Sequence, residues 1–202
     1  RLTVYLSALL VLPLGQGYLE DRRINRSEFV PLLLLSVVGM AALGTANDLI
    51  TLFIALEVLS MALYVLASWA RRDRRSQEAG LKYLIVGSVA SAILLYGAAL
   101  IYVATGSVDL PGIDLELMIA GRPSAVAVIG LGLVTVGMGF KVALAPFHLW
   151  SPDVYQGAPT PVTAFMAAAT KAAGFAALLR LYLVAFPQFA DLWVPALAVL
   201  AA

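Results

Sequence analysis

The sequence predicts an all-α, polytopic transmembrane helical bundle with one discontinuous helix. Of its 202 residues, 62% are hydrophobic and 12% are charged, and the mean hydropathy is +0.94; this is too apolar for a soluble domain of this size. The apolar runs are continuous instead of alternating, which favours helices over strands, because open sheet edges cannot be satisfied in lipid. We expect residues 1–202 to form a single transmembrane domain.

Seven apolar runs justify this assignment, since a hydrocarbon core of about 30 Å needs about 20 helical residues. They cover approximately residues 2–19, 29–46, 49–69, 79–104, 124–150 and 161–186, and a seventh begins near Leu192. The run over 124–150 is interrupted, and we expect a loop at 105–121. Because the chain opens on Arg1 and stops inside an apolar run too short to cross a bilayer, we expect it to be a piece of a longer protein.

Two arginine-rich loops predict the orientation. The segments DRRINR (21–26) and RRDRR (71–75) are separated by one helical hairpin, so they should emerge on the same side. An excess of Lys and Arg marks the cytoplasmic side of a membrane protein, and we interpret these arginines as such topology signals. The loop at 105–121, which carries acidic residues and neither Lys nor Arg, should then lie outside.

Composition excludes several functional classes. The absence of cysteine removes disulfides, iron–sulfur clusters and thiolate metal sites, and the single histidine cannot form a metal site alone. The basic residues do not gather along an aromatic-studded face, which argues against nucleic-acid binding. We therefore expect no cofactor or metal in this chain, and any redox cofactor should belong to a partner.

Several ionisable residues lie within the apolar runs, among them Glu57, Lys82 and Lys171. Glu57 is separated from Trp69 by roughly 18 Å of helix, which places it near mid-membrane and implies a basic partner or water. Lys171 lies about 15 Å beyond Pro161 among small residues, so its charge should face the protein interior. Lys82 is nearer a helix end, where a snorkelling anchor competes with a functional role.

The interrupted run combines helix breakers with ionisable groups. Pro146 removes a backbone donor, and Gly139 weakens the preceding turn, so we predict a break near residues 143–146. Backbone groups freed by a break are tolerated in a membrane where they line a cavity. Burial and a nearby carboxylate act in opposite directions on the proton affinity of Lys141, so movement of the carboxylate would switch it between holding and releasing a proton. His148, two turns further along if the helix continues, could carry protons near neutrality.

These residues carry a resemblance to a known family. The segment KVALAPFHLWSPDVYQGAPTPVTAF, together with ATKAAGFAALLRL and the earlier ALEVLSMALYVL, resembles the antiporter-like proton-translocating subunits of respiratory NADH:quinone oxidoreductase (complex I). Val154 and Tyr155 stand where sister subunits typically have an alanine–histidine pair, and Lys171 where they commonly have histidine. Both differences favour the branch called subunit N, or subunit 2 in mitochondria.

The resemblance implies a fold and a division of labour. Residues 29–186 would form the first five-helix unit of an inverted-repeat fold, after a preceding helix and cytoplasmic loop (1–28) and before the start of the second repeat (187–202). Glu57 would pair with Lys141, and the other members of the proton path would be Lys82, His148 and Lys171.

The resemblance also implies partners and a location. NADH, FMN, iron–sulfur clusters and quinone would belong to partner subunits, so this chain would perform no redox chemistry itself. Its partners would be other complex I membrane subunits and the lipid of a bacterial inner membrane. Two alternatives stay open: a subunit of a cation/proton antiporter, and a purely structural subunit.

Overall fold

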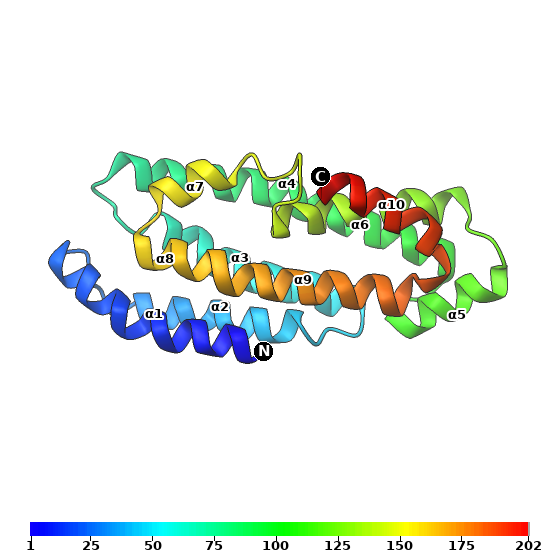
Figure 1. The fold of residues 1–202 in the computed structure, drawn as a ribbon, viewed down its shortest axis with the longest axis horizontal. Coiled ribbons are helices and arrows are strands. Elements are labelled where there is room, and N and C mark those ends of the chain that lie inside the picture. The colour runs from blue at the N-terminus through cyan, green and yellow to red at the C-terminus, as the bar shows by residue number, and fades with distance from the viewer. Residues whose placement is uncertain (202) are drawn as a thin grey trace.

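The computed structural model describes residues 1–201, which form an elongated helical bundle (Figure 1). Those residues contain no strand, and their only bridge of the β type joins Asp48 to Asp109. The all-helical prediction is therefore confirmed. The α-helices are α1 Leu2–Asp21, α2 Phe29–Leu43, α3 Leu49–Ala67, α4 Arg74–Thr105, α5 Leu110–Ala120, α6 Ala125–Val142, α7 Ser151–Gly157, α8 Thr160–Phe165, α9 Lys171–Arg180 and α10 Ala190–Ala201.

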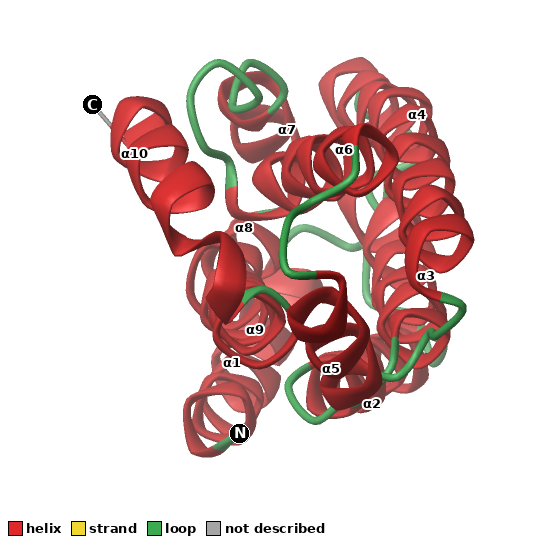
Figure 2. Ribbon diagram, turned by 90° about the vertical axis from the view of Figure 1, so that its right-hand side faces the viewer, coloured by secondary structure: helices red, strands yellow, loops and turns green. Residues whose placement is uncertain are grey.

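Five helical segments are long and apolar enough to cross a membrane. They are Leu2–Asp21, Leu49–Ala67, Arg74–Thr105, Ala125–Val142 and Thr160–Ala185. The shorter apolar segments Phe29–Leu43 and Pro187–Ala201 account for the remaining predicted runs. Viewed along the bundle in Figure 2, α10 projects at the edge, and it contributes no buried residue.

Close helix contacts in the bundle depend on glycine. Gly137 of α6 lies against Ala90 and Leu94 of α4, where a β-carbon would be 2.6 Å from Leu94 Cβ. Gly39 of α2 packs in the same way on the backbone of Leu59 in α3. Small residues let helix backbones approach closely, which is how membrane helices gain van der Waals packing in the absence of a hydrophobic driving force.

The predicted break follows α6 directly. Ala143 has φ 59° and ψ 49°, the left-handed conformation, and two backbone hydrogen bonds close the helix end: Leu144 N to Gly139 O at 2.9 Å and Ala143 N to Phe140 O at 3.1 Å. These two bonds define a Schellman motif, with alanine at the position usually taken by glycine. Residues 143–150 are not helical, and Pro146 lies within them. Gly139 therefore contributes its carbonyl to the helix end.

The expectation of a loop at 105–121 was wrong, because this segment contains α5. Asp109 caps the helix by accepting from Gly112 N at 3.1 Å, Pro111 occupies its first turn, and Gly121 ends it in the left-handed conformation. Leu110, Ile113 and Leu117 are buried at helical spacing. These are local helix signals, and they form a short helix between the predicted apolar runs.

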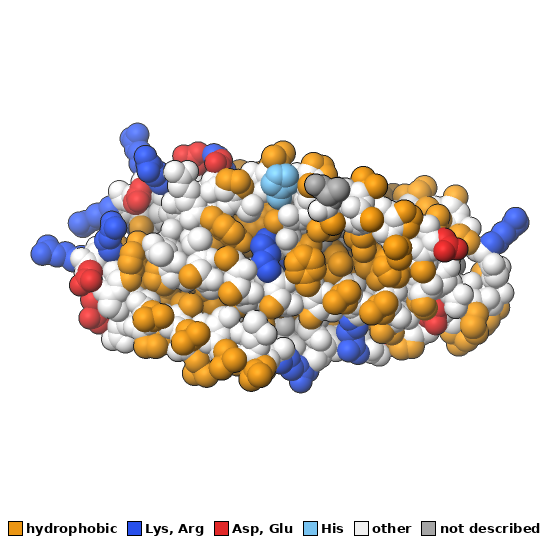
Figure 3. All heavy atoms as spheres, viewed as in Figure 1, with side chains coloured by type: hydrophobic (Ala, Val, Ile, Leu, Met, Phe, Trp, Pro, Cys, Tyr) orange, Lys and Arg blue, Asp and Glu red, His pale blue; other side chains and the backbone are white. Residues whose placement is uncertain are grey.

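The charged ends of the bundle fit the predicted topology. Both arginine-rich loops, 21–26 and 71–75, lie at the left-hand end in Figure 1, and α5 lies at the opposite end. On the face seen in Figure 3, Lys and Arg side chains are most numerous at that left-hand end, while hydrophobic side chains extend over the central part. We call this end the arginine-rich end.

Candidate functional site

The site is centred on Lys141, which lies in the last turn of α6 and is only 3% exposed. Its Nζ donates to Ser60 Oγ of α3 at 2.7 Å and to Tyr83 Oη of α4 at 3.3 Å. The C-terminal end of α6, with its partial negative charge, favours an ammonium group at this position. Both side-chain partners are neutral hydroxyls, so the lysine is solvated by protein dipoles in place of water.

Glu57 lies one turn before Ser60 on α3, and it accepts a hydrogen bond from Ser91 Oγ of α4. The expected direct pair between Glu57 and Lys141 is not formed: within residues 1–201, salt bridges of 4.0 Å or less involve only Lys82. The carboxylate is turned toward Ser91, while the ammonium reaches Ser60, about 4.5 Å further along the helix axis at 1.5 Å per residue. The two charges therefore have different hydroxyl partners: Ser91 for Glu57, and Ser60 and Tyr83 for Lys141.

The space around these groups is small. A hollow of about 10 Å³ lies between α3, α4 and α6, and Ser60, Ser91 and Lys141 contribute to its lining. This volume is at the lower limit for one water molecule. Contact between Glu57 and Lys141 therefore needs either movement of a side chain or a single bridging water.

Lys171 approaches the same helix end from the other side. It is partly buried, and its Nζ donates a long hydrogen bond of 3.5 Å to Lys141 O. The ammonium lies 5.1 Å from the centre of the Trp150 ring and 5.9 Å from that of Tyr155, so both aromatic faces stabilise its charge. Trp150 Nε1 donates to Phe140 O at 3.1 Å. The carbonyl of Lys141 thus accepts from the Lys171 side chain, and the carbonyl of Phe140 accepts from the Trp150 side chain as well as from Ala143 N. Helical spacing within the sequence does not relate these side chains to the two carbonyls.

A π-helical turn, Met166–Thr170, directly precedes Lys171. A second π-helical turn, Leu181–Ala185, follows α9. Such turns are rare and occur frequently at functional sites. The sequence predicted one regular helix over 161–186, and nothing in its apolar pattern distinguishes the wider turns.

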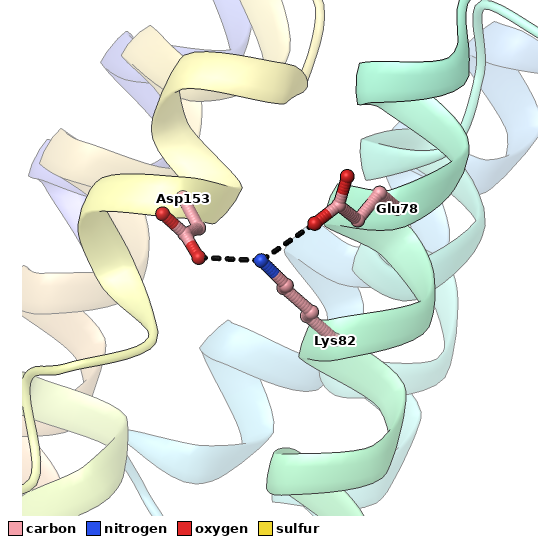
Figure 4. Close-up of polar contacts among 3 residues, drawn as sticks. All are labelled: Glu78, Lys82 and Asp153. Carbon is pink, nitrogen blue, oxygen red and sulfur yellow. Dashed lines mark hydrogen bonds and ion pairs between the residues drawn. The ribbon is translucent and has the colours of Figure 1, made fainter.

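The structure separates His148 and Lys82 from this buried cluster. His148 is exposed and lies in the non-helical segment after α6, so it does not continue the Lys141 face as helical spacing had suggested. Lys82 lies at the surface of α4, with a side chain 45% exposed, and contacts Glu78 and Asp153 at 2.6 Å each (Figure 4). Asp153 lies in the first turn of α7.

Four residues of the site were missed by reasoning from the sequence: Ser60, Tyr83, Ser91 and Trp150. Ser60 had a local signal, because it lies three residues after Glu57 on the same helix and so shares its face. The other three residues reach the cluster only through packing of α4 and the broken helix. Polar residues at i+3 or i+4 from an intramembrane charge therefore merit attention in such sequences.

Comparison with known proteins identifies the family. Residues 46–202 match the family described as NADH:quinone oxidoreductase/Mrp antiporter, transmembrane. The NADH-quinone oxidoreductase subunit N 1 of Sorangium cellulosum is 48% identical over 218 aligned residues, which cover 100% of this chain and 42% of the relative. Subunit N of Mycobacterium tuberculosis is 52% identical over 174 residues, covering 86% of this chain and 33% of the relative.

Solved structures give the same result. A chain of respiratory complex I from Thermus thermophilus matches with a TM-score of 0.78 at 44% identity, over 98% of this chain and 40% of that chain. A chain of the Mrp complex from Dietzia sp. matches with a TM-score of 0.72 at 27% identity, over 82% of this chain and 31% of that chain. This sequence spans between 31% and 42% of the length of these relatives. Because the family match covers most of its residues, the chain belongs to the NADH:quinone oxidoreductase/Mrp antiporter transmembrane family.

Proposed function

We propose that this chain is part of a proton-translocating membrane subunit of NADH:quinone oxidoreductase. The similarity to proteins named subunit N supports this, and one structural observation carries it. Lys141 is buried at the end of a broken membrane helix, and its ammonium meets only neutral hydroxyl groups of side chains. Ionisable groups inside a membrane are costly and mark ion pathways.

The relay would use Glu57, Lys141 and Lys171 as its buried members. If Glu57 turns from Ser91 toward Ser60, its carboxylate approaches the ammonium of Lys141 and stabilises the bound proton. Return of Glu57 to Ser91 would leave Lys141 with neutral partners and favour release. The proton would pass toward Lys171, which already contacts the Lys141 carbonyl, through water admitted at the break. His148, exposed beside the break, would exchange protons with that water.

Electron transfer from NADH to quinone would take place in partner subunits and would drive this movement. The chain has no cysteine, so iron–sulfur clusters, which are held by Cys thiolates, would be bound elsewhere in the complex, together with FMN and quinone. Its partners would be the other membrane subunits of the complex, including sister antiporter-like subunits. The assembly would reside in the bacterial inner membrane, with the arginine-rich end in the cytoplasm.

Replacement of Lys141 by alanine in the assembled complex tests this proposal. We expect the number of protons pumped per NADH oxidised to fall, with loss of the proton flux through this subunit by about tenfold or more, since no side chain would bind the proton at the break. Ser88→Ala, at an exposed position of α4, is the control for effects on assembly. Undiminished pumping by Lys141→Ala would contradict the assignment.

A subunit of a cation/proton antiporter is the second candidate, because the family description and the Dietzia Mrp complex include such proteins. The same buried cluster could move protons without quinone chemistry. The identity of 27% to that complex, against 44% to the complex I chain, weighs toward the first function. Sodium-dependent proton transport in vesicles, in the absence of NADH and quinone, would favour the antiporter.

A further inference from the structure

Lys82 and Asp153 join two elements that are far apart in the sequence. Lys82 lies on α4 and Asp153 in the first turn of α7, the short helix that resumes after the break; 71 positions separate them. Figure 4 shows the ammonium of Lys82 between the carboxylates of Asp153 and Glu78. The pair borders a polar pocket of about 230 Å³ that also includes Arg75 and Gln156. Water therefore has access to these charges.

The same helix interface has an aromatic contact further inside. Tyr83 follows Lys82 directly and is 1% exposed. Its ring stacks on Trp150, the residue that precedes α7, with ring centres 4.7 Å apart and planes 4° from parallel. Tyr83 also accepts the hydrogen bond from Lys141. The exposed Lys82–Asp153 ion pair and the buried Tyr83–Trp150 stack thus both join α4 to the start of α7. The buried stack also contacts Lys141 through Tyr83.

Close backbone packing makes this interface sensitive to small displacements. Gly157, the last residue of α7, lies against the Arg75 carbonyl and Ala79 at the start of α4, so that a β-carbon there would be 2.4 Å from Arg75 O. The segment between α6 and α7 is not helical, so no continuous backbone hydrogen bonding fixes α7 relative to Lys141. Contacts with α4, together with the hydrogen bond from Trp150 to Phe140 O, supply that position.

We propose that Lys82 and Asp153 are positioning residues, whose ion pair holds α7 on α4 and keeps the Trp150 ring stacked on Tyr83 beside Lys141. This inference rests on the proposed relay, but it assigns Lys82 a role that does not require proton transfer. Lysine and arginine then differ in a useful way. Arginine preserves the ion pair but stays protonated in proteins, so it cannot act as a proton carrier.

Three variants of the assembled complex test the proposal through proton pumping. Lys82→Met, which keeps an apolar stem and removes the charge, should slow pumping by about tenfold, less than the loss of about a hundredfold that misplacement of functional groups by about 1 Å can cause. Asp153→Asn should act in the same direction. Lys82→Arg should retain most of the activity because the ion pair is preserved. Arg72→Gln, which removes an exposed charge at the same end of the bundle, is the control.

A structure of the Asp153→Asn complex supplies a readout that does not depend on pumping. The stack of Trp150 on Tyr83 should open beyond the 4.7 Å of the native protein. An unchanged stack would overturn the positioning role, as would a Lys82→Met variant that pumps normally. If Lys82→Arg loses as much activity as Lys82→Met, Lys82 carries protons and the proposal is wrong. Normal pumping by Lys141→Ala would instead contradict the proposed function. In that case the Trp150–Tyr83 stack in the Asp153→Asn complex alone would decide whether Lys82 and Asp153 are positioning residues.

Discussion

Lys141 and Lys82 both lie beside the Tyr83–Trp150 stack, but their surroundings are opposite. Lys141 is 3% exposed and meets two hydroxyl groups, whereas the Lys82 side chain is 45% exposed and meets two carboxylates. A lysine held by neutral partners in a buried site gains or loses its proton at modest electrostatic cost when a carboxylate moves. A lysine between two carboxylates holds its proton firmly. The comparison shows that the partners of a charged residue, and not its presence in a membrane helix, indicate what it can do.

The largest effect on proton pumping should come from removing the carboxylate near Lys141, and the carboxylate next to Lys82 provides the comparison. Glu57→Gln removes the charge that we propose to control Lys141, so proton pumping in the assembled complex should fall by about tenfold or more. Glu78→Gln removes a carboxylate from Lys82 but leaves Asp153 in place, so pumping should stay within about twofold of the native rate. Proton uptake by vesicles during NADH oxidation measures both. Equal losses in the two variants would break the distinction between the buried and the exposed lysine.

A smaller effect, on stability, should follow from the packing that supports the buried side. Gly137→Ala places a methyl group against Leu94 and Ala90 of α4, and overpacking of this kind costs about 1–3 kcal/mol. Gly132→Ala is the matched control on the same helix, since nothing lies within 4 Å of a β-carbon there; it should be neutral or stabilising by about 0.5–1 kcal/mol. Thermal unfolding in detergent measures both. Equal unfolding temperatures for Gly137→Ala and Gly132→Ala would contradict the close contact between α4 and α6 at Gly137.

The smallest effect concerns the break itself. Ala143 adopts the left-handed conformation, which is unfavourable for a residue with a β-carbon by about 1–2 kcal/mol. Ala143→Gly should therefore stabilise the protein by about 1 kcal/mol. Ala176→Gly, at an exposed position within α9, should instead destabilise it by about 0.5–1 kcal/mol. A shift of the unfolding temperature in the same direction for both variants would contradict the conformational explanation.

The class of protein, the apolar helices and the place of the break could all be predicted from the amino-acid sequence. These features are local, because hydrophobicity over about 20 residues sets a membrane span and the backbone chemistry of proline sets where a helix cannot continue. The ionisable residues Glu57, Lys141 and Lys171 could be singled out in the same way, since a charge within an apolar run needs a reason. The helix α5 also had local signals, in the Asp109 cap and the terminal Gly121.

The partner of each charged group depends on how the helices pack against one another. Lys141 reaches Ser60 across 81 positions of sequence, and Lys82 reaches Asp153 across 71. Such pairs depend on the rotation and depth of neighbouring helices, which close contacts at residues such as Gly137 and Gly157 fix, and helical spacing within one run does not encode them. For this reason the predicted Glu57–Lys141 ion pair is absent from residues 1–201: Glu57 accepts from Ser91, and Lys141 donates to Ser60 and Tyr83. The same packing places Lys82, which the resemblance assigns to the proton path, in a surface ion pair with Asp153.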